Sequence, residues 1–145
     1  MLAALRPNSF DLPLFLHVFG ATVLFGATAT IAIAGYASRR SPGNSALLAR
    51  VVVGTWLLGI LPAFIVMRAG AAMIVDKEFP DGADTPGWVG VGFIVSEPGA
   101  LLLIIVGILA WISIRNGRVV LAVPILASIY LLALAVAWFA MTGKP

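Results

Sequence analysis

Three ionisable side chains, those of His17, Arg68 and Glu97, lie inside long apolar stretches of this sequence. Placing a charged side chain at the centre of a bilayer costs at least about 2.5–3.5 kcal/mol, so such residues usually face a partner, a cavity or a pathway. An imidazole can ligate a metal or move a proton, a guanidinium can hold a carboxylate, and a carboxyl group can carry a proton. These three residues are therefore the first candidates for chemistry in the chain.

His17 is followed by small residues, with Gly20 and Ala21 three and four positions further along. On a helix these positions share one face with the histidine, and small residues let a neighbouring helix or a flat cofactor approach closely. Near the start of a helix the dipole favours the neutral imidazole, which is the form that ligates metals. The face therefore predicts either helix packing or a cofactor site. For His17, the alternative to a ligand or proton-active role is a hydrogen bond between an interfacial imidazole and a loop carbonyl.

Glu97 is followed directly by Pro98. A proline inside a helix donates no backbone hydrogen bond and leaves the carbonyl one turn earlier, that of Ile94, without its partner. A carboxyl group beside such a kinked turn can line a cavity or an ion path. Pro62 and Pro124 predict similar kinks in two other spans, and the alternative is that all three prolines only shape the helices.

Composition places these residues in a membrane protein. The 145 residues are 61% hydrophobic and 10% charged, whereas soluble domains contain about 25% charged residues. The net charge is +3, but the basic residues flank apolar stretches, so no nucleic-acid partner is expected. The chain has no cysteine, which excludes disulfides and thiolate metal sites. It also lacks a glycine-rich phosphate loop and a Ser/His/Asp arrangement, so no catalytic residue is assigned and a non-enzymatic function is favoured.

Four stretches are long enough to cross a bilayer, which needs about 20 apolar residues per helix. They cover residues 12–36, 46–75, 88–114 and 119–141. Short connections favour antiparallel neighbours. The sequence therefore predicts an all-α membrane protein, a four-transmembrane-helix up-down bundle that forms a single membrane domain over residues 1–145.

Basic residues set the predicted orientation of the bundle. Two of the three connections are flanked by arginines and carry no acid, with Arg39, Arg40 and, just inside the next span, Arg50 at the first and Arg115 and Arg118 at the third. The second connection, residues 76–84, is net acidic. Because basic connections stay in the cytoplasm, we expect both termini and the acidic connection on the outer side.

This topology gathers the three ionisable residues in one layer. At about 1.5 Å per residue, His17 lies roughly 6–9 Å, Arg68 roughly 10 Å and Glu97 roughly 13 Å from the outer end of its span. Arg68 and Glu97 are then natural partners, because pairing offsets most of the cost of burying either charge. The pair is predicted to be either a structural ion pair or a proton site.

The first span also carries a family resemblance. Residues 16–26, which follow the pattern LH-x-x-G-x-x-x-x-x-G with His17, Gly20 and Gly26, resemble the opening of a group of small bacterial four-helix membrane proteins. That group looks related to copper-resistance protein D and to the membrane-type protoporphyrinogen oxidase. In the oxidase branch the matching histidine is linked to haem b, so the resemblance implies haem b at His17, and haem iron is the only metal expected. The chain departs from the oxidase branch in having no lysine in its spans, where Arg68 is the only arginine away from the span ends, and from the copper branch in having a single histidine.

Three functions are compatible with these features. The small polytopic chain favours a non-catalytic accessory subunit of a respiratory or photosynthetic electron-transfer assembly in the bacterial inner membrane, in contact with lipid and with other membrane subunits. The first alternative is a haem- or quinone-associated redox protein, with His17 as ligand, Arg68 near a propionate or quinone head group, and Gly20 and Ala21 beside the cofactor. The second alternative is a proton or cation transport element that uses Glu97.

Overall fold

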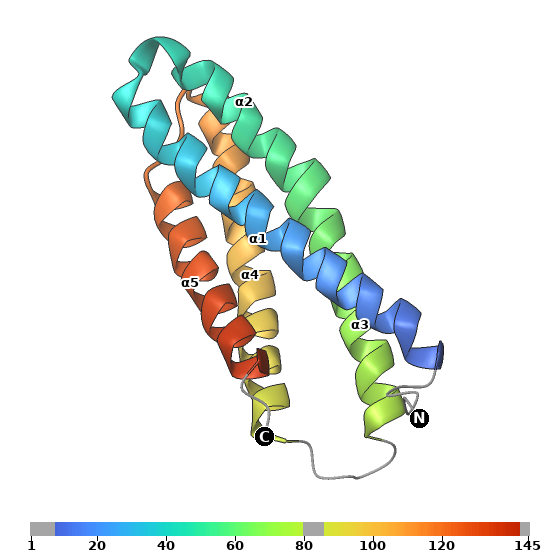
Figure 1. The fold of residues 1–145 in the computed structure, drawn as a ribbon. Helices are drawn as coiled ribbons and strands as arrows, with labels where there is room; N and C mark the ends of the chain where they lie inside the picture. Colours follow the sequence, from blue (N-terminus) through green and yellow to red (C-terminus); the bar gives the residue numbers. More distant parts are fainter. Residues whose placement is uncertain (1–7, 80–85, 143–145) are drawn as a thin grey trace.

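The computed structural model describes residues 8–79 and 86–142, and every regular element within these ranges is helical. The long helices are α1 (Asp11–Arg40), α2 (Ser45–Thr55), α3 (Leu61–Glu78), α4 (Gly87–Arg115) and α5 (Ala122–Thr142). Two short 3₁₀ turns, Asn8–Phe10 and Pro42–Asn44, precede α1 and α2, and a π-helical turn, η3 (Trp56–Ile60), joins α2 to α3. The chain is therefore built from helices stacked side by side (Figure 1).

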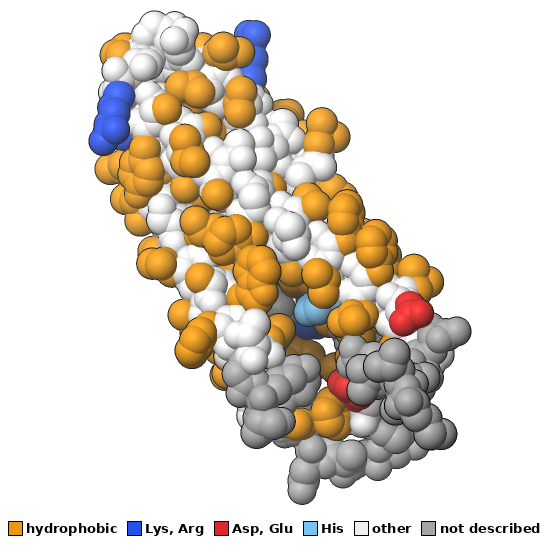
Figure 2. Space-filling model, in the orientation of Figure 1, with side chains coloured by type: hydrophobic (Ala, Val, Ile, Leu, Met, Phe, Trp, Pro, Cys, Tyr) orange, Lys and Arg blue, Asp and Glu red, His pale blue; other side chains and the backbone are white. Residues whose placement is uncertain are grey.

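Four helical segments are long and apolar enough to cross a membrane, as expected of a multi-pass membrane protein. They are Asp11–Arg40, Pro42–Glu78, Val89–Arg115 and Ala122–Thr142. Large apolar side chains are exposed along all of them, and they cover the middle of the molecule in Figure 2. Four helical segments of the predicted length and apolar character are thus present, and most of their ends lie within a few residues of the expected ones.

The fourth span begins three residues later than predicted, because the preceding turn uses more of the chain. Gly117 has a φ of +64°, and the amides of Gly117 and Arg118 donate to the carbonyls of Ile114 and Ser113. This is the pattern that closes a helix with a glycine in the left-handed conformation. Val120 then donates to the Ser113 hydroxyl at 3.0 Å, so its amide is satisfied outside the helix.

Pro62 and Pro124 have different effects on the backbone of their helices. The Leu61 amide donates to the carbonyl of Trp56, five residues earlier, so the helix widens into η3 just before Pro62, which has no amide to donate. Pro124, in contrast, lies in the first turn of α5, where no helical hydrogen bond is lost. The helix is therefore distorted next to Pro62, as predicted. The prediction of a kink at Pro124 is wrong, because α5 starts only two residues earlier, at Ala122.

The helices form two closely packed pairs. α1 packs mainly against α3 and also against α5, α4 packs mainly against α5, and α2 packs against α1 and α4. Figure 1 shows α3 and α4 diverging toward the end of the bundle where α1 begins and α5 ends. At the opposite end Gly35 of α1 lies against Pro124 of α5, where a Cβ would be 2.7 Å from the proline Cβ. The two pairs are therefore joined through α1 and α5, while α3 and α4 separate toward the end where α1 begins.

Trp56 joins the two pairs near the middle of the bundle. Its indole Nε1 donates to the carbonyl of Leu103 in α4 at 2.8 Å. A Cβ on Gly107 would lie 2.4 Å from the indole ring, so the glycine leaves the space that the ring fills. The turn η3 thus begins with a side chain that fixes α4.

Candidate functional site

Glycines let α1 and α3 cross at backbone contact. A Cβ on Gly20 would lie 2.5 Å from the Met67 amide nitrogen and 2.8 Å from the Ala63 carbonyl oxygen. A Cβ on Gly70 would lie 2.5 Å from the His17 amide nitrogen. No Cβ fits at either position without movement of the partner backbone. Of the two roles predicted for the small-residue face, Gly20 serves helix packing.

This crossing places His17 beside a carbonyl of α3. Its Nδ1 lies 3.1 Å from the Met67 carbonyl oxygen. Because a carbonyl oxygen only accepts, Nδ1 carries the proton in this contact, and the neutral ring then has its lone pair on Nε2. No described residue donates a hydrogen bond to Nε2. The carbonyl belongs to a neighbouring helix and not to a loop, and an imidazole held in this way has a free Nε2 in a fixed orientation.

A cavity of about 360 Å³ lies between the two helix pairs, where they separate. Its walls come from α1, α3, α4 and α5, and the residues from each helix recur every three or four positions, as on a single face. The apolar part of the lining includes Val18, Ala21, Phe25, Leu134 and Trp138, and the polar part includes His17, Arg68, Ser96 and Tyr130. The hollow is visible in Figure 2, with the histidine side chain at its rim. Ligand pockets of about 300–1,000 Å³ with mostly apolar walls and a few polar groups are typical binding sites.

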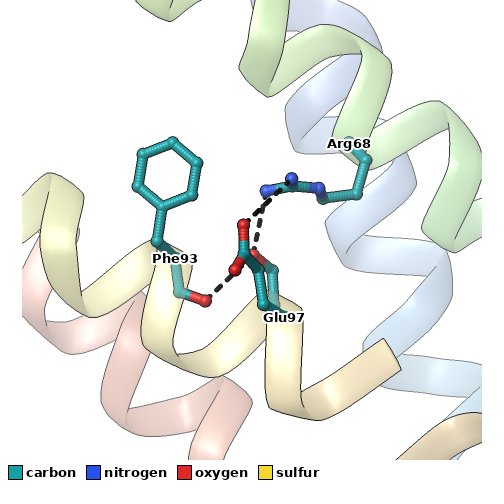
Figure 3. Close-up of polar contacts among 4 residues, drawn as sticks. Arg68, Phe93 and Glu97 are labelled. Carbon is teal, nitrogen blue, oxygen red and sulfur yellow. Dashed lines mark hydrogen bonds and ion pairs between the residues drawn. The ribbon is translucent and has the colours of Figure 1, made fainter. Parts of the chain in front are cut away.

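Arg68 reaches from α3 across to α4. Its Nη1 donates to the Ser96 hydroxyl at 3.0 Å, and its Nη2 lies 3.8 Å from Glu97 Oε1. Its guanidinium carbon is also 5.5 Å from the centre of the Phe93 ring, within the range of a cation–π contact. Figure 3 shows the guanidinium pointing toward α4 between these groups. The side chain therefore links the two helix pairs across the region where α3 and α4 diverge.

The predicted pairing of Arg68 with Glu97 is present, but it is an open contact. The Glu97 side chain is 67% exposed and that of Arg68 is 35% exposed. Glu97 is not among the residues that line the cavity, whereas its neighbour Ser96 is. The structure thus places the arginine on the wall of the cavity and the carboxylate outside it.

Tyr130 of α5 belongs to the same wall and was missed from the sequence. The side chain is 1% exposed, and its hydroxyl has no hydrogen-bond partner in the described part of the chain. The ring lies on Gly99, where a Cβ would be 2.5 Å from Cε2. An unsatisfied buried hydroxyl is costly, and this one is closed off by the packing of the ring. The sequence places a glycine directly after Pro98, where a large side chain can pack, but it does not identify Tyr130 as that side chain.

The predicted site residues therefore separate into three groups. His17, Arg68 and Ala21 lie together on the cavity wall. Gly20 is buried in the contact between α1 and α3. Glu97 contacts Arg68 from outside the cavity. The cavity, and not the ion pair, is the feature that brings the candidate residues together.

The donor set agrees with a haem ligated through one histidine. The free Nε2 of His17 is the group that would coordinate the iron, and Arg68 is the group that would face a propionate. Within the described residues no group of three or more His, Asp or Glu side chains is placed to hold a bare metal ion. Among the described residues, His17 and Arg68 are thus the ones that would hold a haem.

Comparisons with protein-family models, with curated proteins and with solved structures found no match for this chain.

Proposed function

We propose that this protein binds a small amphipathic molecule inside the membrane, in the cavity between its two helix pairs. The observation that carries the proposal is the cavity itself, which combines mostly apolar walls with His17, Arg68, Ser96 and Tyr130. Apolar walls favour a ligand that partitions into lipid, and the few polar groups fix the position of its head group. Binding, and not catalysis, is the function that these residues support best.

Two head groups suit the polar side of the cavity. A haem would use the Nε2 lone pair of His17 and would supply electron transfer when bound, with Arg68 holding a propionate. A quinone would place a carbonyl oxygen near the donors of Arg68, and its reduced form would donate to His17 Nε2. Both are lipid-soluble redox molecules, which links the cavity to a membrane electron-transfer system.

The second candidate is an accessory subunit of such an electron-transfer assembly, without a ligand of its own. This is favoured by the exposure of Glu97, because a carboxylate that faces outward from a membrane helix is more stable against a polar partner than against lipid. The transport alternative has less support, since Glu97 stands outside the cavity wall.

We infer an orientation with both termini on the outer side of a bacterial inner membrane. The arginines of the connections before α2 and after α4 support this orientation through the preference of basic residues for the cytoplasm. The cavity then opens in the outer half of the bilayer.

The proposal is tested by purifying the protein from its native membrane in a mild detergent. An organic extract examined by mass spectrometry, together with a visible spectrum, should yield one lipid-soluble compound in about equal amount to the protein. A Soret band that His17→Ala abolishes would identify haem, and an extracted quinone without a Soret band would identify the alternative. A protein that carries no compound but co-purifies with membrane subunits would favour the accessory role.

A further inference from the structure

Arg68 has more hydrogen-bond donors than the protein uses. A guanidinium carries five N–H donors. In the described part of the chain only Nη1 makes a hydrogen bond, to Ser96, and Nη2 lies 3.8 Å from Glu97, beyond hydrogen-bond distance. Polar groups left without partners in a low-dielectric region are costly. Arg68 is therefore placed to bind an acceptor that residues 8–79 and 86–142 do not supply.

The charge on the cavity wall indicates what this acceptor is. Arg68 is the single Arg or Lys side chain among the lining residues. Glu78, which also lines the cavity, lies ten residues further along α3, or roughly 15 Å away along the helix axis. One cation suits one singly charged group, and the planar fork of arginine matches the two oxygens of a carboxylate. A neutral carbonyl would leave both the charge and most of the donors unmatched.

We propose that the ligand of this cavity is an amphipathic carboxylate, whose head group binds the remaining donors of Arg68 and whose apolar body lies along Val18, Phe25 and Leu134. This inference rests on the proposed function, because it specifies the ligand of the same cavity. In this arrangement Glu97 weakens the binding of the ligand. Its carboxylate competes with the ligand for Nη2 of Arg68 and repels the ligand's charge.

The test compares dodecanoate with dodecanol, two probes that share an apolar chain and differ in charge. Binding is measured by calorimetry at pH 8 on the full-length protein in neutral detergent micelles, with protein-free micelles as the blank. We expect dodecanoate to bind about 10- to 100-fold more tightly than dodecanol, as for a charge-assisted hydrogen-bonded pair. Arg68→Gln should remove this difference and leave dodecanol binding unchanged. Arg39→Gln, at the far end of α1, is the control and should change neither affinity.

Glu97→Gln gives an independent result that does not require the loss of Arg68. It should raise the affinity for dodecanoate about two- to fivefold, the effect of removing one partly exposed charge pair. An unchanged or lower affinity in this variant would overturn the inference, even if Arg68→Gln fails to fold.

The remaining outcomes separate the inference from the proposed function. Equal affinities for dodecanol and dodecanoate, both unchanged in Arg68→Gln, would overturn the carboxylate inference and leave the ligand-binding function standing. Binding of neither probe would also overturn the carboxylate inference, and the compound extracted from the native protein would then decide the ligand-binding function. Dodecyl phosphate binding more tightly than dodecanoate would overturn the assignment of the head group as a carboxylate.

Discussion

The crossing of α1 and α3 predicts that two glycines on the same helix respond in opposite ways to the same substitution. In Gly20→Ala the new methyl group would lie 2.5 Å from the Met67 nitrogen and 2.8 Å from the Ala63 oxygen, whereas ordinary contact begins at 3.4 Å. Both atoms are backbone, so the two helices must separate by nearly an ångström. In Gly26→Ala the new methyl group meets nothing within 4 Å.

The expected energies follow from these distances. Overpacking a tight contact costs about 1–3 kcal/mol, while replacing a helical glycine by alanine gains about 0.5–1 kcal/mol. Gly20→Ala should therefore lose up to about 2.5 kcal/mol of stability, and Gly26→Ala should gain up to about 1 kcal/mol. The assay is unfolding of each variant in detergent micelles, followed by far-ultraviolet circular dichroism. Equal stability of the two variants would refute the account of backbone contact between α1 and α3.

Three further predictions test other parts of the structure. Trp56→Phe removes the hydrogen bond to the Leu103 carbonyl and should lower stability by about 0.5–1.5 kcal/mol in the same unfolding assay; no loss would mean that the indole does not hold α4. Tyr130→Phe removes a hydroxyl without a described partner, so the ligand-free protein should be as stable as the wild type or more stable, and a loss above about 1 kcal/mol would reveal a partner for the hydroxyl. Because the chain has no cysteine, single cysteines can report the orientation: Asp76→Cys should react with an impermeant thiol reagent on intact cells, and Gly43→Cys only after permeabilisation, whereas the reverse pattern would invert the topology.

Much of the fold could be predicted because it depends on composition and length. Four apolar stretches separated by short polar connections give four spanning helices whatever their detailed packing. The pairing of Arg68 with Glu97 was also accessible, since depth along each helix follows from counting residues.

The cavity could not be predicted, because it depends on how the helices cross. Gly70 carries no sign in the sequence that it will contact the backbone at His17, and that contact brings the Met67 carbonyl within reach of the imidazole. Tyr130 was missed for the same reason, since its burial follows from its position opposite Gly99. Pro124 was misjudged because a turn closed by Gly117 shifted the start of α5.

The central claim is that the cavity holds a ligand, and native mass spectrometry of the protein released from its own membranes tests it most directly. The wild type should carry one bound mass, and Leu134→Trp should lose it because the larger side chain fills the cavity. Leu132→Trp is the matched control: this leucine is 68% exposed on the same helix and outside the lining, so the bound mass should remain. Retention of the mass in both variants, or its absence from the wild type, would contradict the claim.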